Sequence, residues 1–486
     1  MSYLLALDIG SSSVRAAIYD GNGKRIEKSF VKNDRRLDVT EDGGAEIDAE
    51  KALAQVIEVI EDVTNQVPEL IEQVEFVATS CFWHSLVGID EKGNALTPVY
   101  GWADTRSAKF VSVLRKNFDE TATHNRVGAR FHPSYWTAKL LWLKDSKPKV
   151  FAKIKYWLSF SDFIAWRFFG KVVTSVSMAS GTGVFDFRKC VWDKKLVEFL
   201  GVSENLPELA KDNQTFQLNE SYVEKFPKLK NSKWFLAIGD GAANNVGAGC
   251  VTNDKAALMI GTSGAMRVCY TGEPPKKLPT GLWCYRVDRK RVLIGGALSD
   301  GGGLYGWLKD TLKLVGTDDE IEGKIAENEP DSHGLTFLPF LAGERSTGWH
   351  AGAQGAILGL HSATDSIDIT QAALESVAYR FAEIFDQLNA VFKIKTIIAS
   401  GGALRESPLW TQIITDVLNQ KMSLPDVREA SSQGVVNLAL ETIGKNAKIE
   451  KETSGQQTIF EPNTNKHNVY KQARKRHKHF YELLCK

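Results

Sequence analysis

The sequence lacks the features that mark secreted, membrane-spanning or nucleic-acid-binding proteins. Its 486 residues include only six cysteines, scattered without a CxxC pair, so neither a zinc site nor a disulfide framework is expected. No apolar run approaches the roughly 20 residues of a membrane-spanning helix. The net charge is +1, so no overall field attracts nucleic acid or an anionic membrane.

The N-terminus also lacks a basic leader and a small-residue cleavage site, because it runs directly into the apolar segment that starts at Tyr3. Together with the cysteine pattern, this predicts a cytoplasmic protein. The hydrophobic content of 43% and the charged content of 24% are typical of a globular chain. A length of 486 residues exceeds what one hydrophobic core usually organises, so two domains are expected.

A phosphate loop of the GxxxxGK[ST] type is absent as well. The segment Gly301–Gly306 matches GxGxxG formally, but it lies in a glycine-rich run without an early strand–helix–strand context. We therefore interpret it as a glycine-rich wall close to a nucleotide rather than as a dinucleotide fingerprint.

What is present instead is a repeated hairpin. Leu4–Ile9 and Val14–Tyr19 have the pattern of two strands joined by the Gly/Ser turn Gly10–Ser13, whose amides and hydroxyls can face an anion. The segment Leu258–Tyr270 aligns with Leu7–Tyr19 without a gap and places Gly261 opposite Gly10. This match favours an internal duplication, with one phosphate-sized hairpin opening each of two similar cores.

Each half continues with helices and strands in alternation. Apolar residues at helical spacing predict helices over Asp48–Val67, Ile369–Phe392 and about Pro408–Asn419, and short apolar runs predict strands at Val74–Thr79 and Thr396–Ala399. Such units indicate mixed sheets covered by helices. We expect an α/β fold with domains at residues 1–247 and 248–486, the first carrying an insertion at about 101–235 beside the cleft.

The basic C-terminal segment Asn465–Lys486 also carries apolar residues at helical spacing. This pattern favours a helix lying on the surface over a nucleic-acid-binding tail.

The stretch Ile238–Gly249 places one carboxylate, Asp240, on a glycine turn after an apolar run. An isolated Gly-Asp-Gly is more often a turn whose aspartate caps the next helix. Here the two hairpins in the flanking halves favour an aspartate that points into a crevice.

Taken together, the ordered motifs resemble the FGGY family of carbohydrate kinases over roughly residues 3–445. The resemblance is carried by the segments Asp8–Arg15, Trp102–Ser107, Gly239–Gly241, Ile260–Gly264 and Gly401–Leu404. It implies two ribonuclease-H-like domains of the actin/hexokinase-like ATPase type around a central cleft. Within the family, the chain is most similar to the gluconokinase subgroup, as the segments His84-Ser85, His132-Pro133 and Leu341–Arg345 also suggest.

The family resemblance implies ATP and Mg²⁺ as cofactors and a role for each matching residue. Asp240 is similar to the general base, and Asp8 to the carboxylate that holds Mg²⁺, mostly through water. The cofactor-binding positions implied for ATP are Ser11, Ser12, Ser13, Arg15, Gly261, Thr262, Ser263, Gly302, Gly401 and Gly402. Because Leu404–Pro408 departs from the common family pattern, contacts to the nucleobase beyond Gly401 and Gly402 are not predicted.

The same resemblance places the substrate beside Trp83, His84 and His132. Asp104 and Arg106 either reach the substrate or form an internal ion pair that braces the cleft. Trp83, Trp102 and Trp136 offer apolar faces to a sugar or belong to the core. A carboxylate on the substrate would need a cationic pocket, for which Arg130 is a further candidate beside the two histidines.

The resemblance implies the ATP-dependent phosphorylation of a small sugar or sugar acid, with D-gluconate as the leading substrate and 6-phosphogluconate as its product. Within the class, the alternative is a ketopentose such as xylulose or ribulose. Outside it, the alternative is a non-catalytic actin-like sensor of sugar and nucleotide. We expect no nucleic-acid or membrane partner, and a homodimer is compatible with the sequence.

Overall fold

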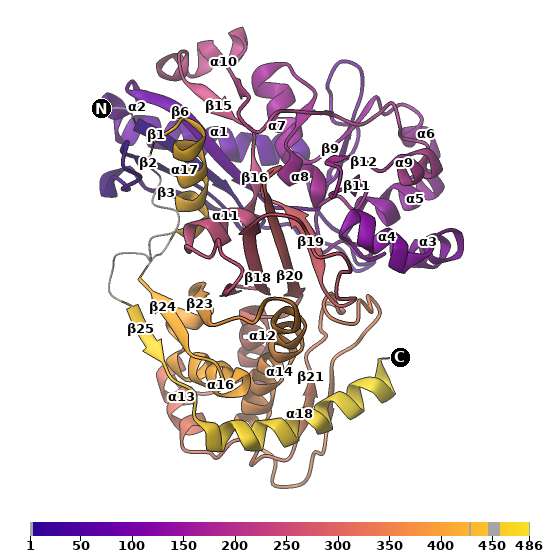
Figure 1. Ribbon diagram of the computed structural model, residues 1–486, viewed down its shortest axis with the longest axis vertical. Helices are drawn as coiled ribbons and strands as arrows, with labels where there is room; N and C mark the ends of the chain where they lie inside the picture. The colour runs from indigo at the N-terminus through magenta and orange to yellow at the C-terminus, as the bar shows by residue number, and fades with distance from the viewer. Residues whose placement is uncertain (1–2, 427–428, 446–456, 486) are drawn as a thin grey trace.

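Two seven-stranded mixed sheets form the centres of the two lobes of the molecule (Figure 1). The structure is a computed structural model that describes residues 3–426, 429–445 and 457–485. The upper lobe in Figure 1 is built mainly from the N-terminal half and the lower lobe from the C-terminal half. The predicted α/β class with two domains around a cleft is confirmed.

The first sheet has the strand order β14-β15-β6-β1-β2-β3, with β16 also paired to β6. Its strands are β1 (Tyr3–Ile9), β2 (Ser13–Tyr19), β3 (Val31–Asp34), β6 (Val74–Cys81), β14 (Thr215–Phe216), β15 (Lys233–Phe235) and β16 (Ile238–Gly239). β6 lies parallel to both β1 and β16, and Cys81 is the register partner of both Ile9 and Gly239. The chain therefore leaves all three strands at one edge, where Gly10, Phe82 and Asp240 follow.

Helix α1 (Ala49–Gln66) covers this sheet and confirms the predicted helix. The Asp48 side chain caps it by accepting a hydrogen bond from the amide of Lys51. Its apolar stripe, which includes Leu53, Val56 and Ile60, is buried in the first core.

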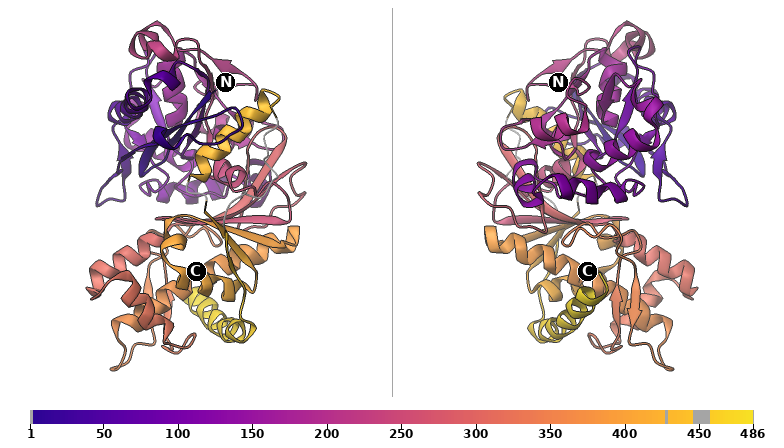
Figure 2. Two further views of the ribbon diagram at one scale, coloured as in Figure 1. Left: turned by 90° about the vertical axis from the view of Figure 1, so that its left-hand side faces the viewer. Right: turned by 90° about the vertical axis from the view of Figure 1, so that its right-hand side faces the viewer.

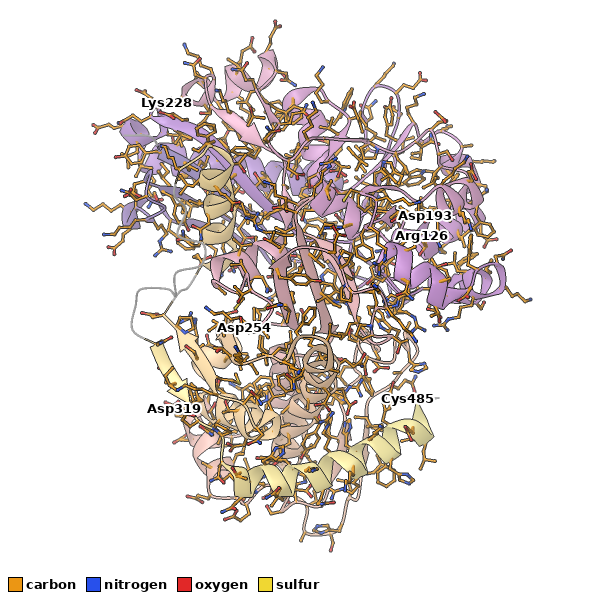
Figure 3. The ribbon with its side chains drawn as sticks, viewed as in Figure 1. Arg126, Asp193, Lys228, Asp254, Asp319 and Cys485 are labelled. Carbon is orange, nitrogen blue, oxygen red and sulfur yellow. The ribbon has the colours of Figure 1, made fainter. Side chains whose placement is uncertain are left out.

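The chain between β6 and β15 of the first sheet forms short helices and strands, and the insertion expected at about residues 101–235 falls within this part of the upper lobe. They comprise β7 (Val87–Ile89), β8 (Val99–Tyr100), α3 (Val111–Asn117), α4 (Glu120–Val127), α5 (Trp136–Ser146), α6 (Pro148–Phe151), β9 (Tyr156–Leu158), α7 (Phe160–Phe169), β10 (Val173–Thr174), α8 (Val176–Ser180), β11 (Phe185–Asp186), β12 (Val191–Trp192), α9 (Lys194–Leu200), β13 (Glu208–Leu209) and α10 (Glu220–Lys225). An ion pair between Arg126 on α4 and Asp193, which caps α9, ties two of these helices together (Figure 3).

The second sheet has the order β19-β20-β18-β17-β23-β24-β25. Its strands are β17 (Lys255–Ile260), β18 (Gly264–Thr271), β19 (Trp283–Arg286), β20 (Arg291–Leu298), β23 (Thr396–Ser400), β24 (Met422–Pro425) and β25 (Gln457–Phe460). The helices of this half are α12 (Gly302–Leu312), α13 (Asp318–Ala326), α14 (Ser366–Phe392), α15 (Gly402–Glu406), α16 (Pro408–Leu418), α17 (Ala430–Thr442) and α18 (Thr464–Leu484). The helices and strands predicted over residues 369–419 are therefore confirmed.

The two hairpins differ by one residue in their turns. In the first, Ile9 pairs with Val14 and the Gly10 amide donates to the carbonyl of Ser13. In the second, Ile260 pairs with Gly264 and the Gly261 amide donates to the carbonyl of Ser263. The gap-free alignment of the return strands is therefore out of register by one residue, because the second turn closes over three residues instead of four.

Helix α17 leaves the C-terminal half and packs on the first sheet (Figures 1 and 2). Val436 and Leu440 join Leu4 and Tyr19 in a buried cluster. α17 also crosses α11 (Asp240–Gly247) so closely that a Cβ at Gly434 would lie 1.8 Å from the carbonyl oxygen of Ala243. The domain boundary at 247/248 stays a prediction, but α17 shows that the C-terminal half of the sequence contributes a helix to the N-terminal lobe.

Helix α18 lies along the lower lobe, as the sequence predicts (Figure 1). Tyr470, Ala473 and His477 are its buried residues, whereas Arg474 and Arg476 form ion pairs with acidic residues of the same lobe. In the part of the chain that the structure describes, none of the helices combines the length and apolarity needed to cross a membrane.

Candidate active site

A cavity of about 820 Å³ lies between the two lobes and brings together most of the predicted site residues. Both hairpin turns line it, as do Asp8, Arg15, Asp240, Gly401 and Gly402. Trp83, His84 and Trp102 form another part of its wall. The parallel strands explain this convergence, because β1, β6 and β16 end at the same sheet edge.

The two predicted nucleotide-binding glycines Gly401 and Gly302 differ in their place relative to the cavity, and only Gly401 lines it. Gly401 has a φ of +101°, and a Cβ there would lie 2.1 Å from the carbonyl oxygen of Ile260, so only glycine fits. Gly302 does not line the cavity. Its amide donates to the carbonyl of Gly261 at 2.8 Å, so it supports the second turn from behind.

Asp8 sits at the end of β1 with its carboxylate almost fully buried. It accepts hydrogen bonds from the Ser80 hydroxyl at 2.6 Å and from Arg15 Nη1 at 3.3 Å. The guanidinium of Arg15 also pairs with Glu429, which precedes α17, at 3.3 Å. The positive charge beside the first turn is therefore already balanced by two carboxylates.

The donor set at Asp8 fits a water-coordinated Mg²⁺ ion. A carboxylate can accept about four hydrogen bonds, and Asp8 receives two from protein donors, so lone pairs remain on the side of the cavity. Mg²⁺ keeps several waters and needs only one or two protein carboxylates.

Asp240 is the first residue of α11, and its Oδ1 accepts a hydrogen bond from the Gly241 amide at 2.7 Å. The helix is capped by Gly239, so Asp240 is not the capping residue. Burial among the cavity walls raises the pKa of Asp240 to about 6, partly offset by the guanidinium of Arg267 and reinforced by the charge of Asp8. No ion pair engages this carboxylate among the described residues, which leaves it available to a ligand.

An aromatic wall flanks Asp240. Trp83 fits a slot of glycines, since a Cβ at Gly239 would lie 1.8 Å from its ring. Its indole donates to the Ser177 carbonyl at 3.0 Å. Trp283 and Tyr285 come from β19 of the lower lobe and stack with ring centroids 4.3 Å apart, and Tyr285 meets Trp83 edge-on at 5.1 Å. Sequence reasoning missed these two aromatics. A strand pattern alone does not indicate that an edge strand of the second sheet contacts residues of the first half.

His84 presents a neutral acceptor to the cavity. Its Nδ1 lies 2.5 Å from the carbonyl oxygen of Gly181, and a carbonyl only accepts, so Nδ1 carries the proton. Burial lowers the pKa of His84 well below its usual value, and the charge of Arg345 acts in the same direction. The other ring nitrogen, Nε2, is therefore an unprotonated acceptor, suited to a hydroxyl donor rather than to an anion.

Three other predicted positions lie outside the cavity lining. His132 is buried against Trp349, with Nδ1 bonded to the Ser134 hydroxyl at 3.0 Å. Trp136 is fully buried and belongs to the core. Arg130 binds Glu120 at 2.9 Å and the carbonyl of Thr280, so it is not part of the predicted cationic pocket.

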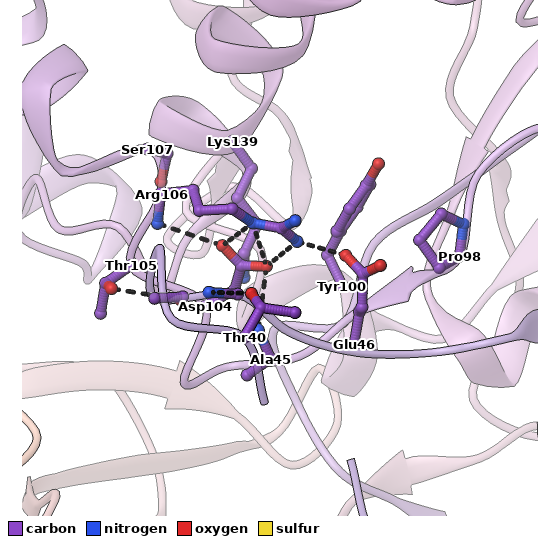
Figure 4. A network of polar contacts seen from close by, with 12 residues as sticks. Thr40, Ala45, Glu46, Pro98, Tyr100, Asp104, Thr105, Arg106, Ser107 and Lys139 are labelled. Atoms are coloured by element: carbon purple, nitrogen blue, oxygen red, sulfur yellow. Dashed lines mark hydrogen bonds and ion pairs between the residues drawn. The ribbon is translucent and has the colours of Figure 1, made fainter. Parts of the chain in front are cut away.

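Asp104 and Arg106 form an internal ion pair rather than cavity walls (Figure 4). Arg106 Nε lies 3.2 Å from both carboxylate oxygens of Asp104, and the guanidinium also reaches Glu46. The side chain of Asp104 further accepts from the Ala45 amide at 3.3 Å. The pair therefore braces the segment that holds Trp102 at the cavity.

Two arginines of the lower lobe supply the cationic groups that the sequence could not place. Arg267 projects from β18 and is 7% exposed, and Arg345 lies in the loop after β21 (Thr336–Leu338) with its guanidinium 5.1 Å above the Trp102 ring. Both line the cavity. Arg345 stood in a family-like motif, but nothing local to the sequence indicates that either side chain enters the cleft.

Asp331, His333 and Glu375 form a second polar cluster, away from the cavity. His333 Nδ1 accepts from the Leu335 amide, so Nε2 donates to Glu375 at 3.2 Å, and Asp331 binds Arg476 of α18. These groups satisfy one another, and the cluster fastens the C-terminal helix.

The fold and the cavity together define a class: two-domain phosphotransferases of the actin/hexokinase-like ATPase type. The FGGY carbohydrate kinase N-terminal domain matches residues 3–238, and the C-terminal domain of the same family matches residues 256–442. The chain belongs to the FGGY family of carbohydrate kinases, and it is therefore a sugar kinase, of a family that uses ATP.

Its relatives act on more than one kind of sugar. Gluconokinase from Bacillus subtilis (strain 168) is 28% identical over 458 residues, covering 91% of this chain and 88% of that relative. The structure of ligand-bound xylulose kinase from Lactobacillus acidophilus superposes with a TM-score of 0.91 at 26% identity, covering 100% and 98% of the two chains. Gluconate kinase from Lactobacillus acidophilus superposes with a TM-score of 0.90 at 27% identity over the same shares.

Proposed function

We propose that the protein transfers the γ-phosphoryl group of ATP to D-gluconate and forms 6-phosphogluconate, with Asp240 as the general base. One observation carries this proposal: a single cavity is lined by both hairpin turns, by Asp240 and by the aromatic wall. Phosphoryl transfer needs the attacking and leaving oxygens roughly in line at the phosphorus and a base beside the attacking hydroxyl. The hairpin turns are suited to the phosphates, the aromatic wall to the sugar and Asp240 to the proton.

In the proposed reaction, Asp240 takes the proton of the attacking hydroxyl. The hydroxyl oxygen forms a bond to the γ-phosphorus as the bond to the bridging oxygen breaks, and ADP leaves. The Gly241 amide donates its hydrogen bond to Oδ1 of Asp240, so we assign proton uptake to Oδ2 of the same carboxylate.

The turn residues Ser11–Ser13 and Gly261–Ser263 would hold the phosphates through amides and hydroxyls, while Gly401 and Gly402 would lie against the nucleotide. Asp8 would hold Mg²⁺, which when bound neutralises charge on the phosphates. Because ATP is the phosphoryl donor, we also propose a cytoplasmic location.

Two observations favour gluconate. Bacillus subtilis gluconokinase is among the most similar relatives, and the cavity holds two arginines that suit a carboxylate. A ketopentose is the second candidate, because the Lactobacillus acidophilus xylulose kinase superposes as closely as the gluconate kinase does.

A substrate panel tests the proposal. ADP release is measured with gluconate, other aldonates, xylulose, ribulose and neutral polyols at equal concentration. We expect gluconate to have the highest kcat/KM. Strong turnover of xylulose without turnover of gluconate would replace the proposed substrate by a ketopentose. Slow ATP hydrolysis that no acceptor accelerates would contradict a kinase role for this cavity.

The substitution Asp240→Asn tests the base. It preserves the shape of the side chain but removes the proton acceptor, so kcat should fall on the order of 10²-fold or more. The KM for ATP should change little, because Asp240 does not belong to either turn. Activity close to that of the wild type would refute the assigned role.

A further inference from the structure

Arg267 is a buried cation without a full set of partners. Its Nε and Nη1 are both buried and have no hydrogen-bond partner among the described residues. The cost of burying a guanidinium is normally met by a paired carboxylate. The carboxylate of Asp240 favours the charged form of Arg267 and acts to raise its pKa, but it makes no ion pair with Arg267 within the described residues. The side chain lines the cavity, so a ligand can reach it.

Glycines on two elements make room for this side chain. A Cβ at Gly241 would lie 3.0 Å from Nε of Arg267, and a Cβ at Gly295, its register partner on β20, would lie 3.0 Å from its Cγ. The Gly241 position would also approach the Trp83 ring at 2.9 Å. The guanidinium therefore packs beside the aromatic wall.

Arg345 brings a second cation to the same space. Its Nε is buried without a partner among the described residues, and its guanidinium stacks on Trp102. Arg345 lines the same cavity as Arg267 and His84, and its charge lowers the pKa of both. Two like charges that line one cavity repel each other, and an anionic ligand between them would relieve that repulsion.

The phosphates of the nucleotide are less suited to be that anion. Arg15 is the arginine beside the first turn, and Asp8 and Glu429 already balance its charge. Arg267 and Arg345 instead contact Gly241, Trp83 and Trp102, which belong to the side of the cavity proposed for the acceptor.

We propose that Arg267 and Arg345 together bind the carboxylate of a sugar-acid substrate. This inference rests on the proposed phosphorylation of a sugar acid and names the groups that would select it over neutral sugars. Guanidinium and carboxylate match in geometry and form charge-assisted hydrogen bonds. Because both arginines come from the lower lobe and Trp83, His84 and Asp240 from the upper one, the acid would bridge the lobes.

The test is a comparison of steady-state constants for Arg267→Met, Arg345→Met and wild type. The KM for gluconate should rise on the order of 10²-fold in each variant, the loss typical of a charge-assisted pair, while the KM for ATP and kcat at saturation change by less than about threefold. Arg130→Met, which removes an arginine outside the cavity, should leave the KM for gluconate unchanged. A fall in kcat at unchanged KM for gluconate would overturn the assignment and indicate a role in phosphoryl transfer.

Thermal unfolding separates binding from a structural role. Without ligand, Arg267→Met should unfold at no lower temperature than wild type, because it removes an unpaired buried charge. A marked destabilisation together with an unchanged KM for gluconate would make Arg267 a structural residue and refute the inference. A wild-type enzyme that phosphorylates no aldonate would instead refute the sugar-acid substrate itself, so the two failures are distinguishable.

Discussion

At the scale of single residues, the environment of Asp240 decides its chemistry more than its identity does. The side chain starts a helix at the edge of a cavity, and burial raises its pKa to about 6. A carboxylate with such a pKa is ionised at neutral pH yet is a better proton acceptor than one with an ordinary pKa. The sequence predicted the position through the Gly-Asp-Gly turn, but it carried no information about the degree of burial.

The pH dependence of catalysis follows from this pKa. Asp240 must be deprotonated to accept a proton, so kcat/KM for the acceptor should rise with pH through about 6 and level off above 7. The measurement is a kcat/KM profile between pH 5 and 8 at saturating ATP. The residual activity of Asp240→Asn should lack this rise. A flat profile in the wild type would show that Asp240 does not take the proton.

The same residue should reduce stability at neutral pH. The pKa of Asp240 is raised from 3.8 to about 6 on folding, so its contribution to stability is present below pH 3.8 and is lost as pH rises through 6. Asp240→Asn should therefore raise the free energy of unfolding at pH 7.5, by about 1–2 kcal/mol after allowance for water in the cavity. The gain should be smaller at pH 4.5, where the wild-type carboxyl is protonated. An equal gain at both pH values would exclude this origin.

At the scale of elements, α11 and α17 can cross closely because each has a glycine at the contact, Gly247 and Gly434. A Cβ at Gly434 would lie 1.8 Å from the carbonyl oxygen of Ala243, and one at Gly247 would lie 1.8 Å from that of Ala430. The helix that carries Asp240 is held by this contact, so its position depends on a segment almost 200 residues later in the chain.

Gly434→Ala tests that contact. The added methyl group forces the helices apart, so thermal unfolding should show a loss of about 1–3 kcal/mol, and kcat should fall because Asp240 shifts. Gly323→Ala on α13 is the matched control, since a Cβ there meets no atom within 4 Å. That substitution should stabilise the protein by about 0.5–1 kcal/mol through the lower entropy of the unfolded chain. Equal effects of the two substitutions would contradict the close crossing.

Secondary structure was predictable because it depends on local spacing. The N-cap Asp48 and the apolar stripe of residues 53–63 define α1 without reference to the rest of the chain. The turn length of the second hairpin was not predictable from the alignment, because the closing hydrogen bond of Gly261 depends on pairing between strands.

At the scale of the whole molecule, direct contacts between the two lobes lie beside the cavity. Tyr285 of β19 bonds through its hydroxyl to that of Tyr135 at 2.6 Å, and the Cys284 amide donates to the carbonyl of Gly128 at 2.8 Å. The lower lobe is therefore already joined to the insertion at one side of the cavity. Closing the remaining opening would exclude water, which otherwise competes with the sugar as acceptor.

Ligand-induced closure is the corresponding prediction. A non-hydrolysable ATP analogue with gluconate should reduce the radius of gyration measured by small-angle X-ray scattering, because each ligand would contact both lobes. The analogue with a neutral polyol of equal length serves as the control and should reduce it less. A radius that stays the same with both ligands present would indicate that the lobes do not move.

The sequence by itself determined local features: the glycine-containing turns of the two hairpins, the aspartate on the glycine turn after an apolar run, and helices such as α1, α14 and α16. These follow from residue spacing and backbone preference, which act within a few residues. Only the tertiary structure decided that Asp104 and Arg106 pair with each other, that His84 is neutral, and that Arg267 and Arg345 line the cleft. The physical reason is that charge pairing and burial depend on which distant segments pack together, and local spacing does not encode those neighbours.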